Sequence, residues 1–173
     1  MITLDQVQSA SATFLQEKWG DGVEVTNIEK IFGGASRETY RLSLLVDGEK
    51  RGVILRRDPP SSLIDTEREL EFGAYARIYP TDIPVPEPLF LVNDKKYLEQ
   101  PFSVMGAIDN CQTDVSLLSV QQKDKLGTQK YTLLGKLAAK DPLDLRFDEL
   151  LPVPDLNRCA IEQLTYWHGV IND

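Results

Sequence analysis

One continuous stretch, TYRLSLLVDGEKRGVILRRD at residues 39–58, limits the folds open to this chain. Tyr40, Leu42, Leu44 and Val46 recur at every second position, which is the period of a strand with one buried face. Asp47-Gly48 follows them, and this dipeptide is a strong signal for a two-residue hairpin turn. Residues 53–56 supply the returning strand. With VEVTNIEKIF in front of it, the stretch predicts three antiparallel strands between residues 23 and 57.

The order of the other expected elements decides the fold class. A capping box of Thr3 and Gln6 begins an N-terminal helix, which Gly20 and Gly22 end. After Pro59-Pro60 come a helix (61–79), a proline-stiffened connector (80–88), two strands within 89–108, a helix (119–140) and a last helix from about residue 157. Strands and helices are therefore segregated, which predicts an α+β fold and not a parallel dinucleotide-binding sheet.

Charge and cysteine content exclude several classes of function. The formal net charge of −8 provides no basic surface for nucleic acid or for an anionic membrane. Cys111 and Cys159 lie far apart and match no metal-binding spacing. The N-terminus has an early acidic residue and no continuous apolar core, so it is not a signal peptide, and no apolar run is long enough to span a bilayer. We expect a cytoplasmic protein.

The stretch FGGASRETYRLSL, residues 32–44, has two interpretations when it is taken alone. Its two glycines either make a plain turn or bring backbone N–H groups close to an anion. It contains neither Gly-x-Gly-x-x-Gly nor Gly-Lys-Ser/Thr, the common phosphate-binding fingerprints. From these residues alone a turn is favoured.

Five segments in fixed order change that balance. They are FGGASRETYRLSL, GVILRRDPP, ERELEFGAYARI, IPVPEPL and PFSVMGAID. Together they resemble the aminoglycoside phosphotransferase and choline-kinase-like family, especially the branch that includes kinase-like domains beside acyl-CoA dehydrogenases. The resemblance implies a protein-kinase-like fold, with an N-terminal lobe at residues 1–110 and the helical start of an incomplete C-terminal lobe at 111–173. That lobe would have a five-stranded antiparallel sheet and one packed helix.

The resemblance also implies the ligands: ATP, a small molecule with a hydroxyl group as phosphate acceptor, and Mg²⁺ in the intact family fold. Gly33 and Gly34 would place backbone N–H groups against the phosphates, and Ser36 and Arg37 would add side-chain donors at the loop tip. The alternative is that the glycines only make the turn and that Arg37 is solvated.

The strand that follows would supply the cation that pairs with the phosphates. By the resemblance, Ile54 lines the adenine slot and Arg56 contacts phosphate, where a guanidinium can bind two oxygens. Because strand side chains alternate, Arg57 is expected on the solvated outer face. A glutamate of the next helix would hold Arg56, and spacing favours Glu71, with Glu67 second. The alternative is that these glutamates only form a solvated face of the helix.

The segment FSVMGAID would lead into the hinge between the lobes. Met105 would sit behind the adenine, and the backbone from Gly106 to Ile108 would offer hydrogen bonds to its edge. The alternative is that Met105 is an ordinary core residue, as most methionines are. The family often has an acidic and an aromatic residue after this methionine, and here glycine and alanine stand there.

The family's catalytic His-Gly-Asp motif is not found in the sequence. The one histidine is His168, in YWHGVIND, so no catalytic base and no metal ligand is predicted. The chain is therefore expected to be the nucleotide-binding half of a kinase, either as a fragment or as a truncated relative. The alternative is a non-catalytic module that binds protein or nucleotide, with self-association through an exposed interlobe surface.

Overall fold

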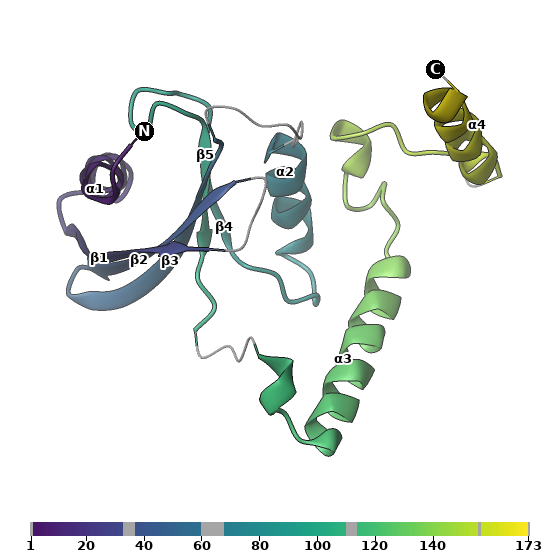
Figure 1. Ribbon diagram of the computed structural model, residues 1–173, viewed down its shortest axis with the longest axis horizontal. Helices are drawn as coiled ribbons and strands as arrows, with labels where there is room; N and C mark the ends of the chain where they lie inside the picture. Colours follow the sequence, from purple (N-terminus) through teal and green to yellow (C-terminus); the bar gives the residue numbers. More distant parts are fainter. Residues whose placement is uncertain (1, 33–36, 60–67, 110–113, 156, 173) are drawn as a thin grey trace.

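A five-stranded antiparallel sheet lies at the centre of the computed structural model, which describes residues 2–32, 37–59, 68–109, 114–155 and 157–172. The strands are β1 (Val23–Ile31), β2 (Glu38–Val46), β3 (Glu49–Arg57), β4 (Pro88–Val92) and β5 (Phe102–Gly106). Their spatial order is β1-β2-β3-β5-β4 (Figure 1). The predicted α+β fold with a five-stranded antiparallel sheet is confirmed.

The β2–β3 hairpin has the turn that its sequence predicts. Val46 pairs with Glu49, so Asp47 and Gly48 alone form the loop. Both have positive φ, 51° for Asp47 and 84° for Gly48, as a two-residue turn between twisted strands requires. This turn fixes the register of β3, and with it the face of the sheet to which each β3 side chain points.

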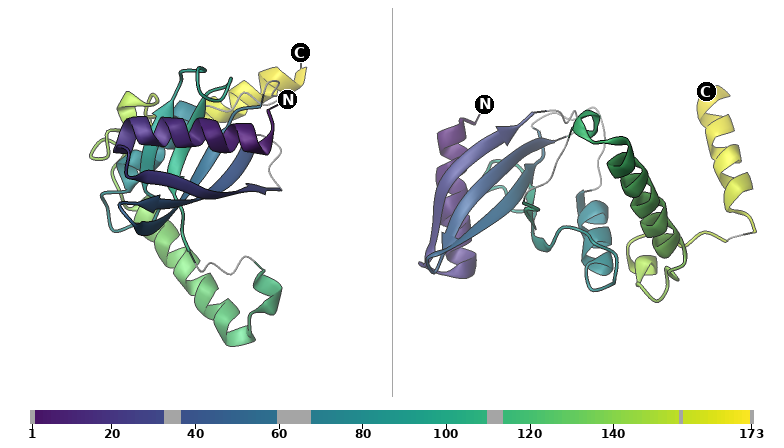
Figure 2. Two further views of the ribbon diagram at one scale, coloured as in Figure 1. Left: turned by 90° about the vertical axis from the view of Figure 1, so that its left-hand side faces the viewer. Right: turned by 90° about the horizontal axis from the view of Figure 1, so that it is seen from below.

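One face of the sheet packs against α1 (Leu4–Trp19) and forms the main core. The predicted capping box is present, because Thr3 accepts from the Gln6 N–H and Gln6 accepts from the Thr3 N–H. The right-hand view of Figure 2 shows α1 on the opposite side of the sheet from α2 (Arg68–Ile78). The buried apolar residues of this core include Val7, Phe14, Leu15, Leu42, Leu44, Val53, Leu55, Phe102 and Val104.

Arg57 contradicts the prediction of a solvated outer-face charge. Its side chain points to the α1 face with Val53 and Leu55 and is 2% exposed. The Arg57 Nε donates to the Leu98 carbonyl at 2.7 Å, and its guanidinium pairs with Glu38. The alternation along β3 is as expected, but the outer face is buried and not solvated.

The chain after β5 is helical and packs little. It comprises η1 (Val115–Leu117), α3 (Val120–Ala138), η2 (Phe147–Glu149) and α4 (Cys159–Asn172), which lead away from the sheet (Figure 1). Most described side chains of α3 and α4 are exposed, including Tyr131, Leu164 and Trp167. The expected division at residues 110 and 111 lies outside the described residues and stays a prediction. Among the described helices, none has the length and apolar character to cross a membrane.

Candidate functional site

The predicted phosphate loop joins two neighbouring strands of the sheet. β1 and β2 pair as far as Ile31 and Thr39, so the loop connects adjacent strand ends. Gly33, Gly34 and Ser36 lie outside the described residues, and their predicted role stays a prediction. Arg37 is the one member of the predicted loop set that the described residues include.

Arg37 is buried, contrary to the alternative of a solvated side chain. Its side chain is 3% exposed and forms ion pairs with two carboxylates. One guanidinium nitrogen donates to Glu71, and Nε lies 3.3 Å from an Asp58 oxygen. The two ion pairs connect Arg37, directly before β2, to α2 and to Asp58, directly after β3. Whether Arg37 also contacts phosphate stays a prediction.

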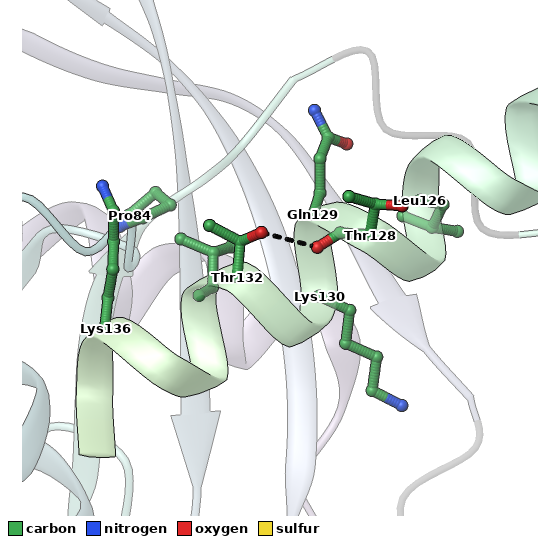
Figure 3. A pocket seen from close by; sticks show the side chains of 8 residues that line it. Pro84, Leu126, Thr128, Gln129, Lys130, Thr132 and Lys136 are labelled. Carbon is green, nitrogen blue, oxygen red and sulfur yellow. Dashed lines mark hydrogen bonds between the residues drawn. The ribbon is translucent and has the colours of Figure 1, made fainter. Parts of the chain in front are cut away.

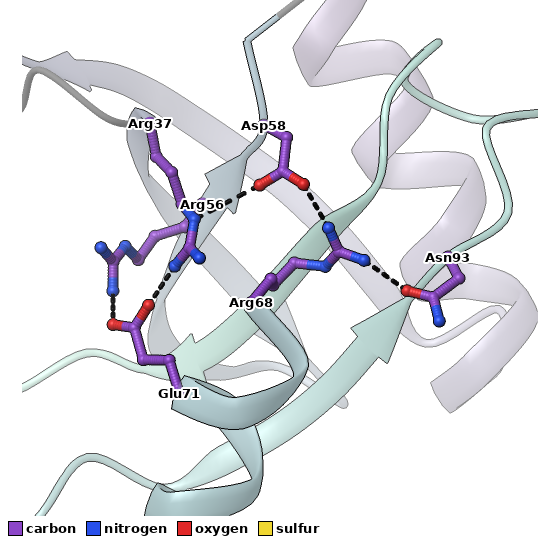
Figure 4. Close-up of polar contacts among 6 residues, drawn as sticks. All are labelled: Arg37, Arg56, Asp58, Arg68, Glu71 and Asn93. Atoms are coloured by element: carbon purple, nitrogen blue, oxygen red, sulfur yellow. Dashed lines mark hydrogen bonds and ion pairs between the residues drawn. The ribbon is translucent and has the colours of Figure 1, made fainter. Parts of the chain in front are cut away.

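Arg56 reaches the same glutamate from β3. Its guanidinium donates to one Glu71 oxygen, while Arg37 donates to the other (Figure 4). The predicted partner of Arg56 is thus Glu71, whereas Glu67, the second candidate, lies outside the described residues. Side-chain exposure is 30% for Arg56 and 33% for Glu71, so the pair is half-buried and accessible from one side.

The electrostatics of Glu71 follow from its two cations. Partial burial would by itself raise the pKa of the carboxyl group. Hydrogen bonds from Arg37 and Arg56 and the charges of both outweigh it and hold the pKa of Glu71 below its ordinary value of 4.5. The one carboxylate of Glu71 accepts hydrogen bonds from two guanidinium groups. The site therefore gathers two cations around one carboxylate in a chain whose net charge is −8, and Arg37 is also paired with Asp58.

A second part of the network continues from Asp58, and reasoning from the sequence missed it. Asp58 binds Arg68 of α2 as well as Arg37, and Arg68 donates to Asn93 after β4 (Figure 4). The signal in the sequence was the aspartate of RRDPP directly after Arg56 and Arg57. Its partners, Arg37 and Arg68, come from the position directly before β2 and from α2, and no spacing along the chain indicates that they meet.

The expected adenine wall is formed by neighbouring strands. Ile54 and Met105 are directly opposite each other in the β3–β5 pairing, so both side chains lie on the face that carries Arg56. Met105 is 7% exposed and lines a small hollow with Arg56, Glu71 and Phe72. This burial also fits the alternative that Met105 is a core residue, and its contact with a base stays a prediction.

Two backbone donors of the expected hinge are already used. The Gly106 N–H donates to the Glu87 carbonyl at 2.7 Å, and the Ala107 N–H donates to the Gly52 carbonyl at 3.0 Å. Ile108, the last expected hinge residue, has a side chain that is 58% exposed. The hinge is thus fixed to the sheet up to Ala107, and among the hydrogen bonds between described residues none uses the N–H of Ile108.

A larger hollow lies elsewhere, between Pro84 and α3 (Figure 3). Its volume is about 720 Å³, and its lining includes Thr128, Thr132 and Lys136. It shares no lining residue with the arginine network. Hydrogen bonds from Lys140 and Lys136 hold the Asp82 carboxylate near this hollow and lower its pKa to about 2, so these contacts fasten α3 to the connector before β4.

Comparison with known families assigns most of the chain. Residues 27–168 match the phosphotransferase enzyme family. The chain belongs to this family. The matched range contains Arg37, Arg56 and Glu71, the described helices from η1 to η2, and α4 as far as His168. The recognition made from the five sequence segments is confirmed.

A solved structure shows the same fold. It is a "putative aminoglycoside phosphotransferase" from Ralstonia eutropha JMP134, with a TM-score of 0.68 and 17% sequence identity. The similarity covers 94% of this chain but 47% of that protein, so the chain spans about half of its length. No curated protein matches the chain at a significant level.

Proposed function

We propose that this chain is the nucleotide-binding half of an ATP-dependent phosphotransferase that acts on the hydroxyl group of a small molecule. The observation that carries the proposal is the Arg56–Glu71 ion pair, which links β3 to α2 and shares Glu71 with Arg37, at the end of the loop between β1 and β2. A cation held by a helix carboxylate next to such a loop suits the phosphates of a nucleotide. Family membership supports the reaction class.

In this proposal the phosphates are bound by charge and by backbone donors. Arg56 would bind phosphate oxygens with its exposed guanidinium edge, because Glu71 fixes its orientation. Gly33 and Gly34 would permit close backbone approach, since neither has a Cβ atom. Arg37 shares Glu71 with Arg56, so its charge would strengthen the attraction for phosphate even without direct contact.

The base of the nucleotide would lie against Ile54 and Met105. Since the N–H groups of Gly106 and Ala107 are engaged within the sheet, the hinge would meet the edge of the base through carbonyl oxygens and through the Ile108 N–H. Fewer backbone groups are then available to the base than the sequence predicted, because that prediction included every backbone group from Gly106 to Ile108.

The described residues at this site do not fit Mg²⁺. The two carboxylates nearest the proposed phosphate position, Glu71 and Asp58, are both held by arginines. Bound guanidinium groups occupy the oxygens that a hard cation would need. Among the described residues, no cluster of three or more histidine, cysteine or acidic side chains could hold a metal ion. We therefore assign no step to a metal held by these residues.

A second candidate is a non-catalytic module that binds a partner or a second copy. It is favoured by the exposed apolar side chains of α4, among them Ile161, Leu164, Trp167 and Ile171, because large exposed apolar patches tend to be covered. Light scattering after size exclusion tests it. A monomer at all concentrations would contradict self-association.

The test of the nucleotide proposal is an ATP titration by calorimetry. Arg56→Ala should weaken binding by about tenfold or more, since it removes a charge-assisted contact. Gly34→Val should weaken it through steric exclusion of the phosphates, while the fold is retained. Arg158→Ala is the matched control, because Arg158 lies directly before α4 with a side chain that is 68% exposed. If both Arg56→Ala and Gly34→Val bind ATP with the same affinity as the parent chain, the proposed site is refuted.

A further inference from the structure

We propose that residues 146–150 act as a strut that positions α2, and that Arg77 is a positioning residue for Glu71. The role in catalysis rests on the proposed function, because Glu71 matters there as the partner of Arg56. The geometric part of the proposal does not depend on the proposed function. It states that contacts on the face of α2 that points away from the sheet determine where the Glu71 carboxylate lies.

The helix is held on two opposite faces. An α-helix turns by about 100° per residue, so Glu71 and Gly73 lie about 200° apart around α2. Glu71 faces the sheet and its arginines. Gly73 and Arg77, four residues apart, share the opposite face, and both contact the segment that contains η2.

Gly73 makes the close approach possible. It is buried, and a Cβ atom at this position would lie 2.6 Å and 3.0 Å from the two methyl carbons of Leu150. A glycine inside a helix costs about 1 kcal/mol relative to alanine. The absence of a Cβ atom leaves room for the Leu150 side chain, whose methyl groups would have to move if another residue stood at this position.

Arg77 adds a polar clamp beside this contact. Its Nε donates to the Arg146 carbonyl at 2.7 Å, and a terminal nitrogen lies 3.0 Å from a Glu149 oxygen. Another terminal nitrogen donates to the Gly73 carbonyl at 3.2 Å. Arg146 has a left-handed backbone with φ of 57°, and its own Nε donates to Glu149 at 2.9 Å. These bonds fix the turn of the strut against α2.

The helix α2 contacts β4 and β5, but the described side chains that it presents to the sheet are only half-buried. Gly73 is the only fully buried residue among the described residues of the helix, and it is buried by the strut. On the sheet side, α2 is held by Glu71, Arg68 and half-buried side chains such as Phe72. If the strut is removed, α2 keeps its contacts with β4 and β5 but loses the packing on Gly73 and the bonds to Arg77. The bonds from Glu71 to two guanidinium groups should then lengthen or break.

The test compares Leu150→Ala and Glu149→Gln with the control Leu151→Ala, whose side chain is 44% exposed in the parent chain. Hydrogen exchange of residues 70–78 and the NMR signal of the Arg56 guanidinium report on α2 and on Glu71 without any nucleotide. Leu150→Ala should accelerate exchange in α2 by about tenfold and shift the Arg56 signal, while amides of β2 and β3 are unchanged. Glu149→Gln should act in the same direction with a smaller effect, and Leu151→Ala should change neither.

A second readout separates this inference from the proposed function. ATP affinity should fall several-fold in Leu150→Ala if the parent chain binds ATP through Arg56. Unchanged α2 exchange and an unchanged Arg56 signal in both strut variants would overturn the inference, even where ATP binds as proposed. Changes in both signals in a chain that does not bind ATP would uphold the strut and refute the nucleotide site.

Discussion

Arg56 and Arg57 are neighbours in the sequence and lie on opposite faces of β3. Arg56 is half-buried and pairs with Glu71 of α2. Arg57 is buried on the α1 face, where it binds a carbonyl and a carboxylate. Because a strand alternates its side chains, one pair of arginines supplies both a group suited to a ligand and a group that holds the core together.

The first prediction concerns the buried member of this pair. Arg57→Ala should lower the free energy of unfolding by about 3 kcal/mol, since it removes the Arg57 donor to the Leu98 carbonyl, leaves Glu38 with Lys30 but without its buried cation, and opens a cavity. Arg56→Ala should cost less, because Arg56 is half-exposed. Urea denaturation of both variants measures the difference. A smaller loss for Arg57→Ala than for Arg56→Ala would contradict it.

Local signals in the sequence predicted most of the architecture. The Asp47-Gly48 turn, the Thr3 capping box and the alternation of β2 depend on residues close together in the chain, and the structure has all three. The Arg56–Glu71 pair was also predicted, because the resemblance identified the strand and the spacing identified the helix position.

What the sequence did not predict involves contacts between distant segments. Arg57 was placed in solvent because its partner Leu98 is 41 residues away in a loop without a sequence signal. The burial of Arg37 depends on Asp58 and Glu71, which come from two other elements. Leu150 packs against Gly73, but the hydrophobic periodicity of the sequence does not indicate that these two segments meet. Local patterns cannot supply the tertiary packing that decides these cases.

The second prediction concerns the close contact between β3 and the hinge. A Cβ atom at Gly52 would lie 3.1 Å from the Ala107 Cβ and 3.3 Å from an Arg41 nitrogen. Gly52→Val should therefore push the hinge away from β3 and lower the free energy of unfolding by about 1–3 kcal/mol. The Ala107 amide, which donates to Gly52, should exchange faster with solvent. Gly127→Val is the control for the steric effect, because on exposed α3 an added Cβ would meet no atom from outside its own helix backbone within 4 Å. If the Ala107 amide in Gly52→Val stays as protected from exchange as in the parent chain, the prediction is wrong.

The third prediction is the pH dependence of the Glu71 cluster. The pKa of Glu71 lies below its ordinary value of 4.5 in the folded chain. The stability that its charge contributes is therefore fully present above about pH 4.5 and is lost as pH falls through the lower, folded pKa. Glu71→Gln leaves the buried Arg37 and the half-buried Arg56 without their shared carboxylate, and we expect a loss of about 2 kcal/mol at pH 7.

That loss should shrink as pH falls below 4.5, because the parent chain then protonates Glu71 and loses the same interaction. Urea denaturation of parent and variant between pH 3 and pH 7 measures it, and other carboxylates titrate in both chains and cancel in the difference. Glu162→Gln on α4 is the control, since the Glu162 side chain is 49% exposed and pairs only with Arg158 among the described residues. The difference in the free energy of unfolding between Glu162→Gln and the parent chain should stay near zero from pH 3 to pH 7. A Glu71→Gln difference that does not change with pH would mean that the carboxylate's charge does not hold the two arginines, and that its shape and hydrogen bonds alone account for the loss.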